Sequence, residues 1–142
     1  MPVGDLAVEA QTARKDATVT DLAQRMGDEG IGDFVIVEDE TPVGIVTDRD
    51  IALAVGQHDD ISAMTAADLM AEDLATIRAD AEAVELPKKM AEHRVRRIPV
   101  VDEDGKLQGV VTLDDVVATV GEELDAIAAV IEAQSPEYSP TE

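Results

Sequence analysis

A seven-residue motif occurs twice in this chain, 65 residues apart, and it is the feature that most constrains the fold. The first copy, Gly-Ile-Val-Thr-Asp-Arg-Asp, covers residues 44–50, and the second, Gly-Val-Val-Thr-Leu-Asp-Asp, covers residues 109–115. The similarity continues upstream, where Thr12 and Thr76, among other pairs, recur at an offset of 64. Self-similarity at a fixed period indicates copies of one supersecondary unit. The sequence therefore predicts two units that are each too small to be stable without packing on the other.

Each motif predicts a short buried strand that leads directly into a helix. The apolar pair after Gly favours packed, extended backbone, and Thr followed three residues later by Asp is a capping-box pattern. Upstream of each motif, the apolar patterns predict a strand, a helix and a second strand. Pro87 lies beyond the first position of the second such helix, so this helix is expected to begin late or to be distorted. The upstream strands are predicted near 12–14, 34–37, 76–78 and 98–101, and the helices at 19–28 and up to about 93.

We expect four parts along the chain. Leu124, Ile127 and Ile131 recur at spacings of three and four, which predicts an additional amphipathic helix after the second unit. Periodicity alone leaves open whether that helix packs on its own chain or on another subunit. The composition then changes to Ser, Pro, Thr and Glu, which is typical of a disordered tail. The parts are the first unit with its linker (1–64), the second unit (65–121), the C-terminal helix (122–134) and the tail (135–142).

The charge of the chain argues against nucleic acid and anionic membranes as partners. The formal net charge is -21, from 32 Asp and Glu against 11 Lys and Arg, and such a field repels polyanions. Lysine is scarce, Phe and Tyr occur once each, and most apolar residues are Ala or Val. This composition resembles that of halophilic proteins, in which molar salt screens a dense carboxylate surface. The N-terminus resembles no signal peptide, and no apolar run is long enough to span a bilayer, so a cytoplasmic location is expected.

The residue types present offer little for catalysis. There is no cysteine and only two histidines, so neither a disulfide framework nor a thiolate or histidine metal site is expected. The sequence contains no phosphate loop of the Gly-x-x-x-x-Gly-Lys type and no nucleophile with an adjacent base. We therefore predict that the protein is not an enzyme and that it has no cofactor.

The two tandem units, each closing on Gly-apolar-apolar-Thr-x-x-Asp, resemble the cystathionine-β-synthase (CBS) domain family. The stretch Val-Arg-Arg-Ile-Pro-Val-Val-Asp at 95–102 adds to the resemblance, which extends over residues 3–120. The arrangement looks like a complete CBS pair, or Bateman module, with no enzyme or channel attached. The resemblance implies a mixed α/β fold in which two pseudo-symmetric units pack through their sheets. It also implies clefts between the units that bind AMP, ADP, ATP or S-adenosylmethionine.

Both motifs contain residues suited to a ribose. Asp50 and Asp115 can each accept two hydrogen bonds from vicinal hydroxyls, and Thr47 and Thr112 lie where a hydroxyl could meet ribose or phosphate. The helix N-terminus adds free amides that favour an anion. The alternative is that each Thr-x-x-Asp is only a helix cap. The second unit is closer to the family pattern, which slightly favours Asp115, but Arg49 in the first motif could supply a cation there and reverse this ranking.

Residues 93–97 hold three of the seven arginines of this acidic chain. One interpretation is a helix C-terminus that attracts cations; the other is a phosphate clamp. The resemblance implies that Arg96, three residues before the strand proline, faces the ligand phosphates, with Arg97 a second candidate. The first unit has Gly32 at the equivalent position, so the two clefts are expected to differ. By analogy with the family, the residues lining the base pockets are Thr76 and Ile77, with Thr12 and Ala13 opposite.

We therefore expect a non-enzymatic regulatory module that senses an adenosine-containing ligand. A homodimer is expected because the helices after each motif and the C-terminal helix offer more apolar surface than one pair covers, and because the family commonly dimerises. The alternative is a protein-interaction or scaffold module whose clefts are vestigial. The sequence leaves open which ligand binds, whether one or both clefts are used, and which partner is regulated.

Overall fold

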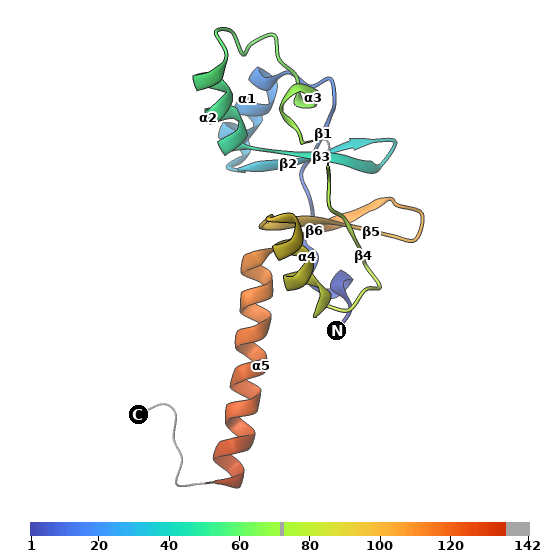
Figure 1. Cartoon of the computed structure of the whole chain (residues 1–142), viewed down its shortest axis with the longest axis vertical. Coiled ribbons are helices and arrows are strands. Elements are labelled where there is room, and N and C mark those ends of the chain that lie inside the picture. Colours follow the sequence, from blue (N-terminus) through green and yellow to red (C-terminus); the bar gives the residue numbers. More distant parts are fainter. Residues whose placement is uncertain (72, 136–142) are drawn as a thin grey trace.

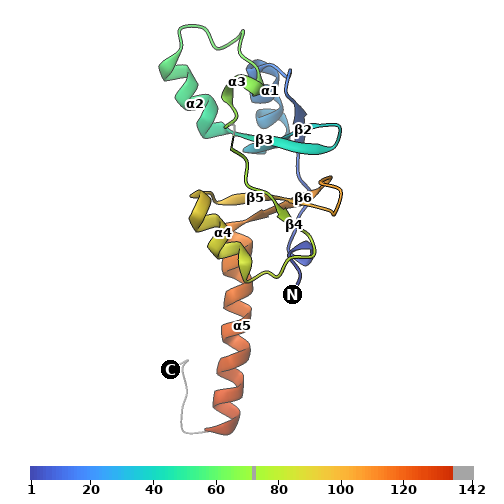
Figure 2. The same ribbon diagram turned by 45° about the vertical axis from the view of Figure 1, so that its right-hand side comes forward.

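The computed structural model describes residues 1–71 and 73–135 and contains two units whose three-stranded sheets face each other. Figure 1 shows helices on the outer side of each sheet and a long helix, α5, that extends away from the second unit. The view turned by 45° shows the same layers (Figure 2). The mixed α/β architecture of two equivalent units is confirmed.

The two units have the same order of elements. In each, the first strand pairs in parallel with the second, and the second pairs antiparallel with the third, which carries the motif. The first unit consists of β1 (Thr12–Arg14), α1 (Val19–Glu29), β2 (Asp33–Glu38), β3 (Thr41–Thr47) and α2 (Asp48–Gln57). The second consists of β4 (Ile77–Arg78), α4 (Glu85–His93), β5 (Arg97–Val101), β6 (Leu107–Thr112) and α5 (Leu113–Gln134). Two short helices precede the units, η1 (Val3–Asp5) and α3 (Ala66–Leu69).

The helix ends follow from local chemistry. At the start of α1 the Thr18 hydroxyl accepts the N–H of Asp21 at 3.1 Å, and the helix ends at Gly30 in the left-handed conformation. Helix α4 has no side-chain cap and begins two residues later than its counterpart, with Pro87 in its first turn, where no intrahelical N–H is needed. The expected late start of this helix is confirmed.

The leading segment of each unit packs in the core of the other unit. Val3, which is fully buried, lies in the core formed by the second unit, and its N–H donates to the Ala81 carbonyl at 2.8 Å. Conversely, Ala66 of α3 is buried in the core of the first unit, and its N–H donates to the Ala17 carbonyl at 2.9 Å. A boundary between residues 64 and 65 therefore separates the two repeats in the sequence. It does not separate the two cores, because each core contains residues from both sides of it.

The packing of each leading segment on the opposite unit explains why both motifs begin with glycine. A Cβ on Gly109 would lie 2.6 Å from the carbonyl oxygen of Val8, and a Cβ on Gly44 would lie 2.7 Å from the Cβ of Met70. The Val8 segment is bonded to the motif strand in both directions, by Val8 N–H to Val110 at 3.0 Å and the reverse at 2.9 Å. The motif strand thus lacks a side chain where the exchanged segment crosses it.

The C-terminal helix differs from the expectation in one respect. The helix expected at 122–134 is not separate, because α5 runs without interruption from the second motif to Gln134. Gly121 lies inside it and does not break it, because the helix penalty of a single glycine is only about 1 kcal/mol. Most of the predicted disordered tail, residues 136–142, lies outside the described residues.

Candidate functional site

A cavity of about 340 Å³ lies between the two units. The first unit contributes the motif strand β3 and the start of α2, and the second contributes the turn between α4 and β5. The segment that leads into β4 completes the wall. The lining residues are Ile45, Thr47, Arg49, Asp50, Ala71, Asp73, Leu74, Ala75 and residues 94–97.

The first motif forms a full capping box on this cavity. The Thr47 hydroxyl accepts the Asp50 N–H at 3.2 Å, and Asp50 Oδ2 accepts the Thr47 N–H at 2.9 Å. Within the described residues these contacts use only Oδ2 of the carboxylate, so Oδ1 remains able to accept a hydrogen bond. The helix-cap interpretation and the ligand interpretation are therefore compatible, since one oxygen can serve each role.

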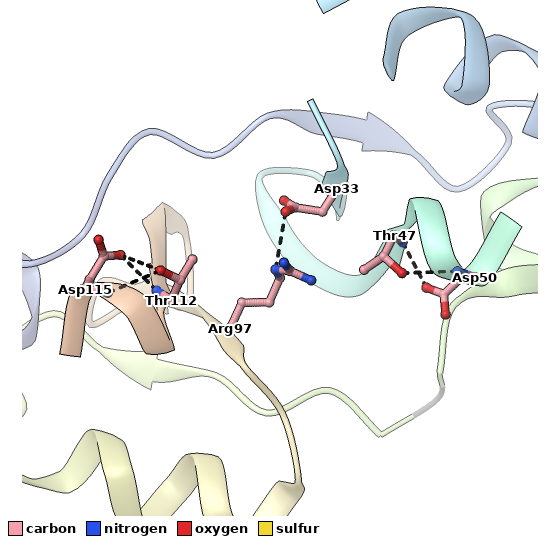
Figure 3. A network of polar contacts seen from close by, with 6 residues as sticks. All are labelled: Asp33, Thr47, Asp50, Arg97, Thr112 and Asp115. Atoms are coloured by element: carbon pink, nitrogen blue, oxygen red, sulfur yellow. Dashed lines mark hydrogen bonds and ion pairs between the residues drawn. The ribbon is translucent and has the colours of Figure 1, made fainter. Parts of the chain in front are cut away.

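The second motif has the same internal geometry but does not line this cavity. Asp115 Oδ2 accepts from the Thr112 N–H and from the Thr112 hydroxyl, each at 3.0 Å. Figure 3 shows this pair on the opposite side of Arg97 from the pair formed by Thr47 and Asp50. The two motifs thus face two different positions between the units.

Four of the seven arginines in the chain line the cavity. Arg94 is in the left-handed conformation that ends α4, with a φ of 56°, and this turn brings the following arginines to the cleft. Arg96 lies 3.8 Å from Asp114 in an ion pair whose side chains are 74% and 88% exposed, so water competes for both partners. Arg49 comes from the opposite unit, at the start of α2. The four are Arg49, Arg94, Arg96 and Arg97.

An ion pair between equivalent residues lies at the centre of the interface. Arg97 Nε is 3.3 Å from Asp33 Oδ2, and these residues begin β5 and β2, at the repeat offset of 64 (Figure 3). Arg97 Nε is buried and makes no well-directed hydrogen bond in the described structure, so the contact is mainly electrostatic. At the place where the second unit presents arginines, the first unit therefore presents a glycine and a carboxylate, Gly32 and Asp33.

The four predicted base-pocket residues are not on this cavity. Ile77 is buried in the second core and Thr76 is half-buried, while Leu74 and Ala75, just upstream, line the cavity instead. Thr12 and Ala13 border a separate hollow against α1, which also contains Arg25.

Leu74 and Ala75 are among the lining residues that were not recognised from the sequence. Their only sequence signal is their place immediately before the predicted strand at 76–78. The side chain of Ile77 is needed in the core, so the wall of the cleft is supplied by the residues that precede the strand.

Two facing sheets built by a tandem repeat, with an arginine-lined cavity between them, define the class of protein as a tandem α/β module. The particular family follows from a match of the CBS domain family model to residues 3–57 and 66–122, and the chain belongs to this family. An uncharacterised relative, MK0525 of Methanopyrus kandleri, is 36% identical over 132 residues, covering 86% of this chain and 67% of the relative. Both repeats are therefore CBS domains.

Solved structures agree in fold. Hypoxic Response Protein I, solved with two coordinated zinc ions, is 30% identical with a TM-score of 0.75, over 84% of this chain and 98% of that protein. The CBS domain pair of protein MJ0100 was solved with 5-methylthioadenosine and S-adenosyl-L-methionine. It is 24% identical with a TM-score of 0.73, over 87% of this chain and 98% of that chain.

Among residues 1–71 and 73–135, no three or more His, Cys, Asp or Glu side chains come together as a metal-binding group. In that same part of the chain, no helix combines the length and the hydropathy needed to cross a bilayer.

Proposed function

We propose that this protein is a non-enzymatic regulatory module that binds an adenosine-containing ligand in the cavity between its two CBS domains. The observation that carries the proposal is the gathering of four of seven arginines on one cavity of a chain whose net charge is -21. A surface cation in such a protein is surrounded by carboxylates, so a concentration of guanidinium groups marks a place where anions are favoured. The adenosine derivatives bound by the MJ0100 pair support the choice of ligand class.

The cavity offers a separate group for each part of a nucleotide. Oδ1 of Asp50 accepts a hydrogen bond from a ribose hydroxyl, while the amides at the N-terminus of α2 favour an anion. The guanidinium groups, led by Arg96, pair with the phosphates. Ile45, Leu74 and Ala75 supply aliphatic surface for the base, because no aromatic side chain among residues 1–71 and 73–135 lines the cavity.

The charge of the cavity favours AMP, ADP or ATP over S-adenosylmethionine. S-adenosylmethionine carries a sulfonium, an ammonium and a carboxylate group, so its net charge is positive. The cavity is lined by four arginines against two aspartates, Asp50 and Asp73, so its field disfavours a cation. A phosphate chain gains from the same field. Each added phosphate should therefore increase affinity.

The two clefts should bind unequally. By the symmetry of the repeat, a second cleft would place Thr112 and Asp115 opposite residues 30–33, the counterpart of the arginine segment, which holds no cation and one carboxylate, Asp33. A phosphate there would meet repulsion where the first cleft offers attraction. We therefore propose one strong nucleotide site per chain, to which the first unit contributes Thr47 and Asp50.

The second candidate function is a scaffold module with vestigial clefts, and the observation favouring it is the exposed apolar face of α5. Calorimetric titration of AMP, ATP, adenosine and S-adenosylmethionine in high potassium chloride separates the two functions. Binding of ATP near one molecule per chain, tighter than adenosine, supports the sensor. Absence of binding by all four at millimolar concentration supports the scaffold and rejects the sensor.

A further inference from the structure

The ion pair between Arg97 of β5 and Asp33 of β2 joins the two units beside the cavity. Arg97 lines the cavity, whereas Asp33 is not among its lining residues. The two side chains are 33% and 30% exposed, which makes this the least exposed ion pair in the described part of the chain. A pair that water reaches poorly holds its partners more firmly than an exposed pair does. Asp33 can therefore fix the orientation of a cavity arginine without contacting the cavity itself.

The position of Asp33 is fixed by the sheet of the first unit. Asp33 opens β2 and is the register partner of Thr47 at the end of β3. Side chains of directly opposite residues in an antiparallel pair lie on the same face of the sheet. The carbonyl of Gly32, the preceding residue, accepts the N–H of Asp48 at 2.9 Å and ties β2 to the start of α2. Asp33 is thus held beside the threonine of the Thr-x-x-Asp motif that lines the cavity.

The ion pair leaves part of the Arg97 guanidinium able to bind a ligand. Nε of Arg97 is the atom that faces Asp33, at 3.3 Å from Oδ2 (Figure 3). A guanidinium has five N–H donors in a planar fork, so contact through Nε leaves the terminal NH₂ groups able to donate. An anion in the cavity and the Asp33 carboxylate can therefore contact different sides of the same side chain.

Without Asp33, two effects would oppose a fixed position of Arg97. Three other arginines line the same cavity, and like charges repel one another. A ligand that must itself immobilise a flexible arginine also loses affinity, because ordering a side chain with many rotamers costs entropy. A carboxylate that orders the guanidinium before the ligand arrives removes this cost.

We propose that Asp33 is a positioning residue of the nucleotide site, because it holds the Arg97 guanidinium at the cavity. The pair thereby fixes the distance between the arginines of the second unit, which meet the phosphates, and the Thr-x-x-Asp motif of the first, which meets the ribose. The inference rests on the proposed function and adds to it a residue outside the cavity. Asp33 acts through Arg97 and does not contact the ligand.

The test is calorimetric titration of ATP, adenosine and inorganic triphosphate in about 1 M potassium chloride, where the Debye length is about 3 Å. Asp33→Asn keeps the shape of the side chain and removes its charge. It should weaken ATP and triphosphate roughly 3- to 10-fold and leave adenosine within about twofold, because only the first two ligands need an ordered guanidinium. A merely structural role would weaken adenosine as well. Melting temperatures without ligand check that the variant stays folded.

Asp114→Asn is the matched comparison, because Asp114 also pairs with a cavity arginine, Arg96, but its side chain is 88% exposed. The variant removes the same charge from the neighbourhood of the cavity. ATP affinity should stay the same or rise, since an exposed pair does little to order its arginine. An equal loss of ATP affinity in Asp33→Asn and Asp114→Asn would contradict the proposal, because the effect would then follow the charge and not the ordering of Arg97.

A double variant tests whether Asp33 acts through Arg97. In an Arg97→Gln background, Asp33→Asn should cause no further loss of affinity for ATP or triphosphate. Additive losses would reject the proposal, since Asp33 would then act independently of Arg97.

The ligands also separate this inference from the proposed function. A wild-type protein that binds ATP, together with an Asp33→Asn protein that binds it equally well, rejects the role of Asp33 and leaves the nucleotide site standing. A wild-type protein that binds triphosphate but neither ATP nor adenosine rejects the proposed function, and the same variants then decide the role of Asp33 with triphosphate. Absence of binding by all three ligands rejects both.

Discussion

The duplicated motif provides a matched pair of variants, Asp50→Asn and Asp115→Asn. Both aspartates accept the backbone N–H of the threonine that caps their helix, at 2.9 and 3.0 Å. Asparagine keeps one acceptor oxygen for this bond, so both caps survive and the two variants should lose similar, small amounts of stability. They differ in position, because only Asp50 lines the cavity with the arginines.

The expected loss of affinity follows from the free carboxylate oxygen of Asp50. With Oδ2 engaged by Thr47, Oδ1 is the atom that can accept from ribose, and Asp50→Asn replaces it with an amide group that cannot accept. A hydrogen bond to a charged group contributes about 1.5–3 kcal/mol. Its loss corresponds to a roughly 10- to 150-fold weaker ligand.

The measurement is calorimetric titration of adenosine, AMP and ATP into the wild-type protein and both variants. Asp50→Asn should weaken all three ligands by a similar factor, because all three carry the ribose. Asp115→Asn should leave the affinity of each within about twofold of wild type. Equal melting temperatures in the absence of ligand confirm that neither result reflects unfolding.

Two outcomes would refute the reasoning. If Asp115→Asn weakens binding and Asp50→Asn does not, the ligand lies in the pseudo-symmetric cleft, and the arginine cluster has another role. If neither variant changes binding, each Thr-x-x-Asp is only the helix cap that its hydrogen bonds already make it.

Three further predictions can be tested in the same preparations. Arg96→Ala should weaken ATP roughly 10- to 100-fold and leave adenosine unchanged, because only the phosphorylated ligand loses a charge-assisted bond; equal losses for the two ligands, measured by calorimetry, would contradict this. Val3→Ala should cost about 2 kcal/mol and lower the melting temperature by about 5–10 °C, whereas Val8→Ala, at a side chain 50% exposed, should cost much less. The melting temperature should rise from dilute to molar potassium chloride as screening reduces repulsion among the carboxylates, and a melting temperature independent of salt would oppose this.

Local signals in the sequence were sufficient for the fold. The repeat gave two equivalent units, and capping boxes at Thr47 and Thr112 placed the starts of α2 and α5 at the residues where they occur. Pro87 correctly predicted a late helix. These successes share one property, which is that the deciding contact lies within a few residues of the signal.

The exchange of leading segments could not be predicted in the same way. Val3 and Ala66 are buried by residues far away in the sequence, and nothing in their immediate surroundings indicates which core they join. The prediction of a separate helix at 122–134 was wrong because of a local signal. Gly121 indicated a helix boundary, but it is tolerated inside a long helix.

For the candidate site too, individual residues could be predicted from the sequence, but their arrangement in space could not. Thr47 and Asp50 were identified from the motif, and Arg96 and Arg97 from an arginine-rich stretch and the family resemblance; the structure brings all four to one cavity. Their grouping was not predicted, because it depends on the relative placement of the two units. The sequence slightly favoured Asp115, the more typical copy, but the geometry favours Asp50, since the arginines of one unit face the motif of the other.

This crossed arrangement also connects the cavity to the base of α5. The Arg96 carbonyl accepts the N–H of Leu113, the first residue of α5, at 2.7 Å, and the Arg96 side chain pairs with Asp114 one residue later. A phosphate that pairs with this guanidinium competes with Asp114, so nucleotide binding at the proposed site should change the charge at the start of α5. Any resulting effect of ATP on the stability of α5 must equal the effect of α5 on ATP affinity, because binding free energies around a closed cycle are reciprocal. An Arg96→Ala protein should lose this coupling, since the residue shared by the cleft and the helix is then gone.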